Sequence, residues 1–357
     1  MSSYLRRVIV GGAAMVIGLG GLAACGSPNE SEGGGGGEDK TIALLLPETK
    51  TTRYETYDKP LTEAKIKELC DDCTVKYYNA DQDEQKQSQQ METALSAGAK
   101  VIILDPVNGD GAGGMISQAH DSNAKVIAYD RFIEGADYYM SFDNETVGKK
   151  QAEALVAAMG DKGGYLMLNG APSDPNAAQF KAGAHSVLDA AGVKLLTKEY
   201  DNPDWSPDNA QKYVTDQLGK FKPAQINGVY AANDGQAGGV IAALKSAGVA
   251  ANALPPVTGQ DAELAAIQRI LAGEQAMTVY KPFKAEPDKA GEIAVALING
   301  DEVTGTTDYK GVKSFIFDPV VVTKDNVKDT VVADGLLKAG DICTTDYADA
   351  CKAAGIS

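Results

Sequence analysis

An aspartate and an arginine follow directly on a short apolar run in the segment VIAYDR at residues 126–131. The β-prone residues at its start predict a buried strand that ends in Asp130 and Arg131. In open α/β sheets, ligands bind at the carboxyl ends of parallel strands. Asp130 offers acceptor oxygens and Arg131 offers five N–H donors, which suits a ligand covered in hydroxyl groups. A surface salt bridge after a core strand is the alternative interpretation.

Other predicted strand ends repeat this pattern. Planar polar, charged or aromatic side chains follow them at Arg53, Tyr54, Asn176, Trp205, Asn233, Asp261 and Lys281. Taken singly, several of these segments look like helix starts, because Asp234, Asp261 and Ser206 are good N-cap types. Together they predict a carbohydrate site. Charged planar groups form paired hydrogen bonds with neighbouring hydroxyls, and an aromatic ring such as Trp205, the only tryptophan, covers the apolar face of a sugar.

The body of the chain alternates strand and helix patterns, which predicts parallel sheets covered on both faces. Two such runs predict an α/β fold of two doubly wound lobes with a cleft between their strand ends. The predicted strands are Thr41–Leu46, Val75–Tyr78, Val101–Leu104, Val126–Tyr129, Tyr138–Ser141, Tyr165–Leu168, Lys194–Glu199, Gly228–Ala231, Val257–Gly259 and Met277–Val279. Helical patterns lie between them, the clearest at Glu145–Met159.

The first 24 residues are typical of a targeting segment, with a basic start and an apolar stretch rich in Gly and Ala. This segment ends in Leu-Ala-Ala followed by Cys25, which resembles the lipobox of bacterial lipoproteins and implies a diacylglycerol on the Cys25 thiol. An ordinary signal peptide with an incidental cysteine is the alternative. Residues 25–39, rich in Gly, Ser and Glu, predict a flexible tether behind a lipid anchor.

The chain has a formal net charge of −16. Residues 1–24 carry two arginines and no acidic residue, so the remainder has a charge of −18. This excess of acid argues against nucleic acid or anionic lipid as a partner of the folded body. It fits an extracytoplasmic protein.

Four further cysteines stand in two close pairs, Cys70 with Cys73 and Cys343 with Cys351. Four cysteines allow three connectivities, and the two local disulfides need the least rearrangement of the chain. The C-x-x-C at residues 70–73 also fits a metal site. A zinc site would require a second cysteine pair of similar spacing and often includes histidine. Cys343 and Cys351 are spaced more widely, and the chain has only two histidines, so the disulfides are favoured.

Signals for an enzyme are weak. Gly109, Gly111 and Gly114 match G-x-G-x-x-G, the dinucleotide fingerprint. Four residues separate the predicted strand from the first of these glycines, however, where the fingerprint requires an immediate turn. The sequence contains no G-x-S-x-G, Walker A loop or H-E-x-x-H. We therefore expect neither catalytic residues nor a metal nor a cofactor.

From about residue 41 to about residue 335 the chain resembles the type I periplasmic sugar-binding proteins of bacterial ABC importers, and among them the D-xylose-binding group. The matching segments are VIAYDR at 126–131, SFDNETVG at 141–148, NDGQAGG at 233–239, GQDAELAAI at 259–267 and MTVYKP at 277–282. The resemblance implies two Rossmann-like lobes joined by three hinge strands. We place the N-terminal lobe at 40–142 plus about 283–312, and the C-terminal lobe at 143–282 plus about 313–357.

The resemblance also implies the binding residues. Sugar contacts fall on Arg53, Asp130, Arg131, Asn176, Asn233, Asp261 and Lys281, with Tyr54 and Trp205 as stacking rings. Tyr54 departs from the xylose-binding pattern, which has Trp there, and a smaller ring could admit a hydroxymethyl group. Pro175 replaces the usual Asn beside Asn176, and the cysteine pairs lie outside the resemblance.

The sequence thus predicts a monomeric, lipid-anchored protein that captures a monosaccharide, D-xylose first and glucose or another aldose second. It would deliver the sugar to an ABC permease with its cytoplasmic ATPase. A multiple-sugar binding protein of the glucose, galactose and arabinose type and a sugar sensor that presents its ligand to a membrane receptor are alternatives. A LacI-type transcription regulator shares the core fold, but it would need an N-terminal helix-turn-helix in place of the lipobox and tether.

Overall fold

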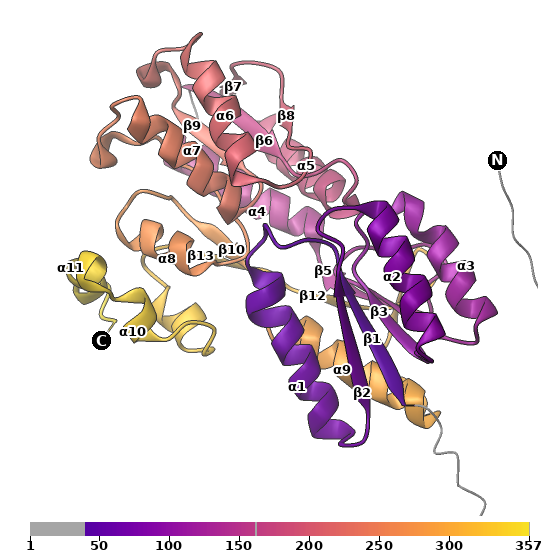
Figure 1. The fold of residues 1–357 in the computed structure, drawn as a ribbon. Helices are drawn as coiled ribbons and strands as arrows, with labels where there is room; N and C mark the ends of the chain where they lie inside the picture. The colour runs from indigo at the N-terminus through magenta and orange to yellow at the C-terminus, as the bar shows by residue number, and fades with distance from the viewer. Residues whose placement is uncertain (1–39, 161–162, 357) are drawn as a thin grey trace, which may run out of the picture. The chain divides into compact units, whose positions relative to one another are not determined.

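The structure is a computed structural model that describes residues 40–160 and 163–356. The predicted signal segment 1–24, the lipid attachment at Cys25 and the tether 25–39 lie outside the described residues. Within the described chain, a seven-stranded sheet, a four-stranded sheet and a two-stranded sheet, with the helices that cover them, form two α/β units (Figure 1). We call the unit around strands β1–β5, β11 and β12 the first lobe, and the unit around β6–β10 and β13 the second lobe.

The sheet of the first lobe has seven strands in the order β11-β12-β5-β4-β3-β1-β2. Neighbouring strands are parallel except β11 with β12. The partial order β2-β1-β3-β4-β5 is a doubly wound order, in which ligands bind at the carboxyl ends of the strands. The strands are β1 (Thr41–Leu46), β2 (Thr74–Asn79), β3 (Val101–Leu104), β4 (Lys125–Tyr129), β5 (Tyr138–Phe142), β11 (Thr307–Tyr309) and β12 (Val312–Phe317).

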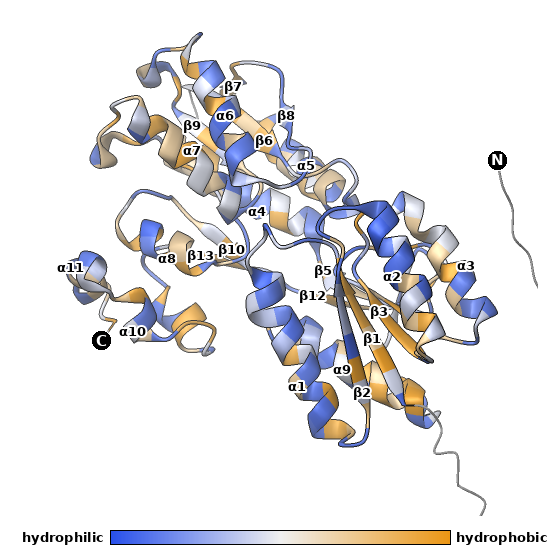
Figure 2. Cartoon of the chain, in the orientation of Figure 1, coloured by the Kyte–Doolittle hydropathy of each residue, from blue (hydrophilic) through white to orange (hydrophobic). Residues whose placement is uncertain are grey.

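Side chains alternate between the two faces of this sheet, since successive residues of a strand point to opposite sides. Ile42 and Leu44 pack on one side with α1 (Lys59–Leu69) and α9 (Ala285–Asn299). Ala43 and Leu45 pack on the other side with α2 (Glu84–Ser96) and α3 (Gly113–Asp121). Both faces are therefore covered, and the central strands β1 and β3 are hydrophobic along most of their length (Figure 2).

The second lobe repeats this plan with shorter strands. Strand β6 lies between β9 on one side and the pair β7 and β8 on the other, because Tyr165 and Leu168 each have two partners. Helices α4 and α5 cover one face, and α6 and α7 cover the other. The elements are α4 (Asn144–Met159), β6 (Gly163–Asn169), α5 (Pro175–Leu188), β7 (Val193–Leu195), β8 (Tyr200–Asp201), α6 (Pro207–Leu218), β9 (Gly228–Ala231), α7 (Asp234–Ser246) and α8 (Leu264–Leu271).

Two predicted strands of this lobe are wrong in detail. The segment Lys194–Glu199 is not one strand but gives way to β7 and β8. Leu195 pairs with Tyr165, and Tyr200 pairs with Leu168. The chain therefore advances five residues from β7 to β8 while β6 advances three, so the extra residues form a bulge between β7 and β8. Val257–Gly259 makes one isolated bridge, at Val257, because the hydroxyl of Thr258 bonds the N–H and C=O of Ala231 in place of the next backbone rung.

The chain passes between the lobes three times. It leaves the first lobe after β5, returns after β10 (Thr278–Tyr280) into α9, and leaves again from β12 to β13 (Val320–Val322). Strand β12 pairs with β5 as far as Phe317, and β13 pairs with β10. The last passage therefore follows Phe317, about five residues later than the boundary near residue 312 that the sequence suggested.

The C-terminal segment packs against α8 through Val327, Val331 and Ile342. Cys343 is bonded to Cys351 in this segment, and Cys70 is bonded to Cys73 after α1, so the structure pairs the cysteines locally. No helix within the described ranges is long and apolar enough to cross a membrane. The remaining helical elements are η1 (Tyr54–Asp58), η2 (Asp110–Ala112), η3 (Pro223–Gln225), η4 (Ala251–Ala253), η5 (Lys328–Val332), α10 (Ala339–Ile342), η6 (Thr345–Tyr347) and α11 (Ala348–Ala353).

Candidate functional site

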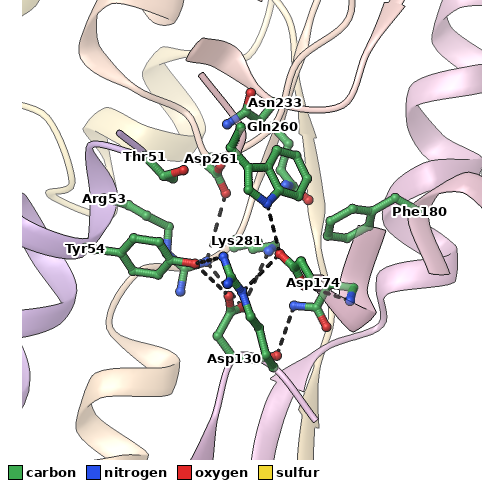
Figure 3. Close-up of a pocket in the computed structure, with 13 residues that line it drawn as sticks. Thr51, Arg53, Tyr54, Asp130, Asp174, Phe180, Asn233, Gln260, Asp261 and Lys281 are labelled. Carbon is green, nitrogen blue, oxygen red and sulfur yellow. Dashed lines mark hydrogen bonds and ion pairs between the residues drawn. The ribbon is translucent and has the colours of Figure 1, made fainter. Parts of the chain in front are cut away.

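A cavity of about 280 Å³ lies where the strand ends of the two lobes meet (Figure 3). All nine residues named from the sequence as sugar contacts or stacking rings line it. Four more residues line it that were not named as site residues: Thr51, Asp174, Phe180 and Gln260. We call this space the main cavity.

Arg53 is held from behind by two carboxylates. Its Nε donates to Asp58 Oδ2 at 2.9 Å and its Nη2 donates to Glu286 Oε2 at 2.7 Å. The remaining Nη1 lies 3.6 Å from Asp130 Oδ1 and 3.9 Å from Asp261 Oδ1, on the cavity side. The outer carboxylates therefore fix the guanidinium so that one nitrogen faces the acids of both lobes.

Arg131 is fixed in a similar way, and its side chain is 1% exposed. Its Nη1 donates to the carbonyl of Pro106 at 2.9 Å and its Nη2 donates to the hydroxyl of Tyr54 at 3.3 Å. Its Nε lies 3.0 Å from Asp174 Oδ2 and 3.3 Å from Asp105 Oδ1, as ion pairs without an aligned hydrogen bond. Asp174 belongs to the second lobe, so this arginine links the two halves of the site.

Asp130 sits in a tight turn at the end of β4. Its φ is +57°, and the N–H of Arg131 donates to the carbonyl of Tyr129 at 2.6 Å, which makes Asp130 the centre of a γ-turn. This costly conformation aims the carboxylate into the main cavity. Its Oδ2 accepts from the Tyr54 hydroxyl at 3.3 Å, and its Oδ1 has no hydrogen-bond partner among the described residues.

Asp130 is ionised over the whole physiological range. Burial opposes its ionisation, but Lys281, Arg53 and Arg131 outweigh burial and lower the pKa of Asp130 to about 2. The Nζ of Lys281 lies 3.7 Å from Asp130 Oδ1. A buried, charged oxygen without a hydrogen bond is a strong acceptor for a ligand hydroxyl.

Asn176 and Phe180 reach the main cavity from the first turns of α5. They are four residues apart, so they lie on the same face of the helix. Asn176 Nδ2 donates to the backbone carbonyl of Asp130 at 3.1 Å, while Asn176 Oδ1 has no partner in the described chain. Phe180 could have been found from this i, i+4 spacing once Asn176 was taken as a contact.

Trp205 lines the main cavity as expected, in a strained backbone conformation with φ of +62°. Its Nε1 donates to Asp174 Oδ2 at 3.2 Å, and its ring meets Phe180 edge to face at 6.3 Å. A Cβ on Gly170 would come within 2.0 Å of the indole, so only glycine fits beneath the ring. Asp174 is thus a positioning residue for both Trp205 and Arg131.

Tyr54 is not a free stacking ring. Its hydroxyl accepts from Arg131 and donates to Asp130, both at 3.3 Å, so its ring is tied into the charged network. The pKa of Tyr54 is raised well above its usual value, chiefly by burial, so the hydroxyl keeps its proton. The substitution of Tyr for Trp therefore adds a hydrogen-bonding group at this wall.

Asn233, Gln260 and Asp261 complete the side formed by the second lobe. Asn233 Oδ1 accepts from the N–H of Gln236 at 3.0 Å and caps α7, which leaves its amide NH₂ for the cavity. Gln260 Oε1 has no partner in the part of the chain described. Asp261 has φ of +95° and precedes α8 without capping it, and burial raises its pKa.

The helix-cap alternative fails at the residues considered for it. Asn233, not Asp234, caps α7, and Ser206 precedes α6 without a capping side-chain bond. Asp234 is instead buried, where its carboxylate accepts from Gln275 and Thr278. Its role is to hold the loop before α8.

The first glycine of the apparent dinucleotide motif lies at the contact between the lobes. The N–H of Gly109 donates to the carbonyl of Ser173 at 3.1 Å, and a Cβ on Gly109 would lie 2.8 Å from Pro175. Lys50 Nζ also reaches Asp204 Oδ2 across the lobes at 2.6 Å. These contacts define a closed arrangement around the main cavity.

Comparison with known proteins agrees with this geometry. The family model for the periplasmic binding protein domain matches residues 42–302. The D-xylose-binding periplasmic protein of Escherichia coli K12 is 36% identical over 311 residues, which cover 84% of this chain and 92% of that protein. The chain belongs to the periplasmic binding protein family. This membership places it among binding proteins and not among enzymes.

Other members of the family bind more than one kind of sugar. The multiple sugar-binding periplasmic receptor ChvE of Rhizobium radiobacter is 33% identical over 288 residues, covering 73% of this chain and 81% of that protein. A solved ABC transporter solute-binding protein from Clostridium phytofermentans, with bound β-D-glucose, is 26% identical and superposes with a TM-score of 0.76. That comparison covers 85% of this chain and 100% of the solved chain. The two-lobed type I fold is thus shared.

Proposed function

We propose that the protein captures a monosaccharide between its two lobes, D-xylose before other aldoses, and hands it to an ABC import permease. One observation carries this proposal. The main cavity is closed by both lobes, and unbonded oxygens of Asp130, Asn176 and Gln260 line it. A sugar hydroxyl donates to one oxygen and accepts from a neighbouring N–H, so one small polyol can satisfy groups of both lobes.

The charge of the lining favours a neutral sugar. Three basic and three acidic side chains line the main cavity, and three further buried acids stand behind the arginines: Asp58, Asp105 and Glu286. A sugar phosphate or sugar acid would add negative charge to an enclosed group that already has an excess of carboxyls. A neutral aldose adds only hydrogen bonds.

The choice of sugar follows from the relatives. Two D-xylose-binding proteins are 35–36% identical to this chain, which supports xylose as the first ligand to test. Tyr54 departs from the xylose-binding pattern, and relatives named for multiple sugars are 30–33% identical. A multiple-sugar binding protein is therefore the second candidate, and its test is the same ligand series.

The sugar would drive closure of the lobes, because only the closed form bonds it from both sides. Calorimetric titration of the purified protein with D-xylose, D-glucose, D-galactose and L-arabinose tests the proposal, alongside the fluorescence of Trp205. We expect saturable binding of at least one aldose with a change in fluorescence. Absence of heat and of fluorescence change with all four sugars contradicts the proposed function.

We propose further that Cys25 carries a lipid and holds the protein at the outer face of the cell membrane. Only the lipobox-like sequence supports this proposal. The wild-type protein should sediment with membranes, whereas Cys25→Ala should not be processed before residue 25. Equal release of both proteins into the medium would reject the anchor.

A further inference from the structure

A second, small cavity lies next to the main cavity, on the far side of Arg53. Arg53, Asp261 and Lys281 line both spaces and therefore separate them. The other walls of this rear cavity are Phe142, Phe283, Asp58 and Glu286. None of these four residues lines the main cavity, and none is among the binding residues predicted from the sequence.

The rear cavity combines apolar walls with one free acceptor. Glu286 is 2% exposed, and its Oε2 accepts from Arg53. Its Oε1 has no hydrogen-bond partner in the described structure. Leaving such a buried oxygen without a partner is costly, so the site lacks a donor that some ligand group could supply.

The protonation of Glu286 fits a neutral donor or acceptor better than a cation. Burial, with the nearby charge of Asp130, raises the pKa of Glu286 to about 8. A protonated carboxyl both donates and accepts, and it therefore pairs well with a hydroxyl. The rings of Phe142 and Phe283 would meet the carbon that carries this hydroxyl.

Of the residues that separate the two cavities, Lys281 is the one whose side chain can move aside. Its Nζ makes an ion pair with Asp130 at 3.7 Å but no hydrogen bond to any described residue. It faces Phe142 and Phe180, with ring centroids 5.8 and 5.3 Å away. Lys281 is thus fixed by one ion pair and no hydrogen bond, whereas Arg53 is held by hydrogen bonds to two carboxylates, so Lys281 is the less firmly fixed of the two.

The opposite wall offers no such room. The sequence suggested that Tyr54, as a smaller ring than Trp, could admit a hydroxymethyl group, but the Tyr54 hydroxyl occupies this wall with hydrogen bonds to Asp130 and Arg131, both at 3.3 Å. An additional carbon on the sugar must therefore point elsewhere.

We infer that the rear cavity is a subsite for the exocyclic hydroxymethyl group of an aldohexose, with Glu286 as its hydrogen-bond partner. This inference rests on the proposed function and extends its substrate class from pentoses to hexoses. An internal water that satisfies Glu286 with every ligand is the competing explanation, and it predicts no dependence on the sixth carbon.

The test compares D-glucose with 6-deoxy-D-glucose, which lacks only the hydroxyl in question, and with D-xylose, which lacks the whole group. In the wild type we expect glucose to bind roughly tenfold more tightly than 6-deoxyglucose, the worth of about one hydrogen bond. Glu286→Leu keeps the volume of the side chain but removes both oxygens, and it should reduce this ratio to near one.

Asp105→Asn is the matched control, because Asp105 supports Arg131 but lines neither cavity. It should weaken all three sugars together and leave the ratio intact. Equal binding of glucose and 6-deoxyglucose by the wild type overturns the subsite even if no variant folds. Binding of xylose without glucose also overturns it. Failure of all three sugars overturns the subsite, and it overturns the proposed function as well only if D-galactose and L-arabinose also fail to bind.

Discussion

The two lobes contribute to the main cavity in different ways. The first lobe presents Arg53 and Arg131, and each guanidinium already bonds to partners within its own lobe or the adjoining hinge. The second lobe presents Asn176 and Gln260, whose side-chain oxygens have no partner among the described residues. The first lobe thus contributes guanidinium groups that are already oriented, and the second lobe contributes uncharged oxygens without a partner beside the acids Asp174 and Asp261.

This difference indicates a division of labour in binding. Charged groups that are already oriented need little reorganisation when a sugar arrives, so the first lobe should supply most of the affinity. The uncharged groups of the second lobe gain their missing bonds only when the lobes close over a ligand. Closure of the lobes is therefore coupled to the formation of hydrogen bonds between the sugar and the polar groups of the second lobe.

The largest loss of sugar affinity is expected from a change in the first lobe. Asp130→Asn removes the charge that Arg53, Arg131 and Lys281 share, and Asn tolerates the positive φ at this position. We expect a loss of roughly 2–4 kcal/mol in binding, or about 30- to 1,000-fold in Kd, measured by calorimetry. The melting temperature of the sugar-free protein serves as the control. Sugar affinity equal to that of the wild type would place the site elsewhere.

The buried acids Asp58 and Glu286, which accept hydrogen bonds from Arg53, should make the stability of the protein depend on pH. Burial raises the pKa of Asp58 to about 6 and, with Asp130, that of Glu286 to about 8. Between about pH 4 and pH 8 the folded protein then holds more protons than the unfolded chain, so its stability falls as the pH rises. Urea unfolding of the sugar-free protein should show a loss on the order of 1–3 kcal/mol between pH 5 and pH 8.

Glu286→Gln is the matched variant for this pH dependence. It removes one of the two titrating carboxyls but retains an oxygen that can accept from Arg53, so its stability should change less between the same two pH values. A wild-type protein that becomes more stable from pH 5 to pH 8 would show that these acids are ionised when folded.

A smaller loss of sugar affinity should follow from the equivalent change in the second lobe. Asp261 lies 3.9 Å from Arg53 and burial raises its pKa, so its charge is less firmly held than that of Asp130. Asp261→Asn should cost about 1–2 kcal/mol, roughly 5- to 30-fold in Kd. The same titration as for Asp130→Asn provides the comparison, and a larger loss than at Asp130 would reverse the proposed division of labour.

The smallest effect is expected at the rim. Lys50 and Asp204 pair across the lobes at 2.6 Å, but both side chains are partly exposed. Such pairs contribute about 0.2–1 kcal/mol, so Lys50→Ala should speed sugar release by less than about fivefold in stopped-flow fluorescence. Lys212→Ala, which removes a pair with Asp216 inside α6, is the control and should leave release unchanged. Identical release rates for the two variants would exclude a role for Lys50 in holding the lobes together.

Hydrophobic periodicity and strand ends determined much of this molecule. A continuous apolar run such as Val101–Leu104 predicts a strand covered by helices on both faces of the sheet. Every residue of that strand is indeed buried. Polar groups after such strands must gather at one edge of the sheet. All nine predicted binding residues therefore line one cavity, and the family resemblance assigned their roles residue by residue.

Only the tertiary structure decided which side chains stand behind these residues. Asp58 and Glu286 are far apart in the chain, yet both hold Arg53, and no local pattern marks either as part of a site. The bulged edge at β7 and β8 and the hydroxyl of Thr258 in place of a strand rung likewise depend on pairing with distant residues. Periodicity reports which way a side chain faces within its own element. Partners, bonding distances and the rear cavity arise from how separate elements pack together, which the local sequence does not specify.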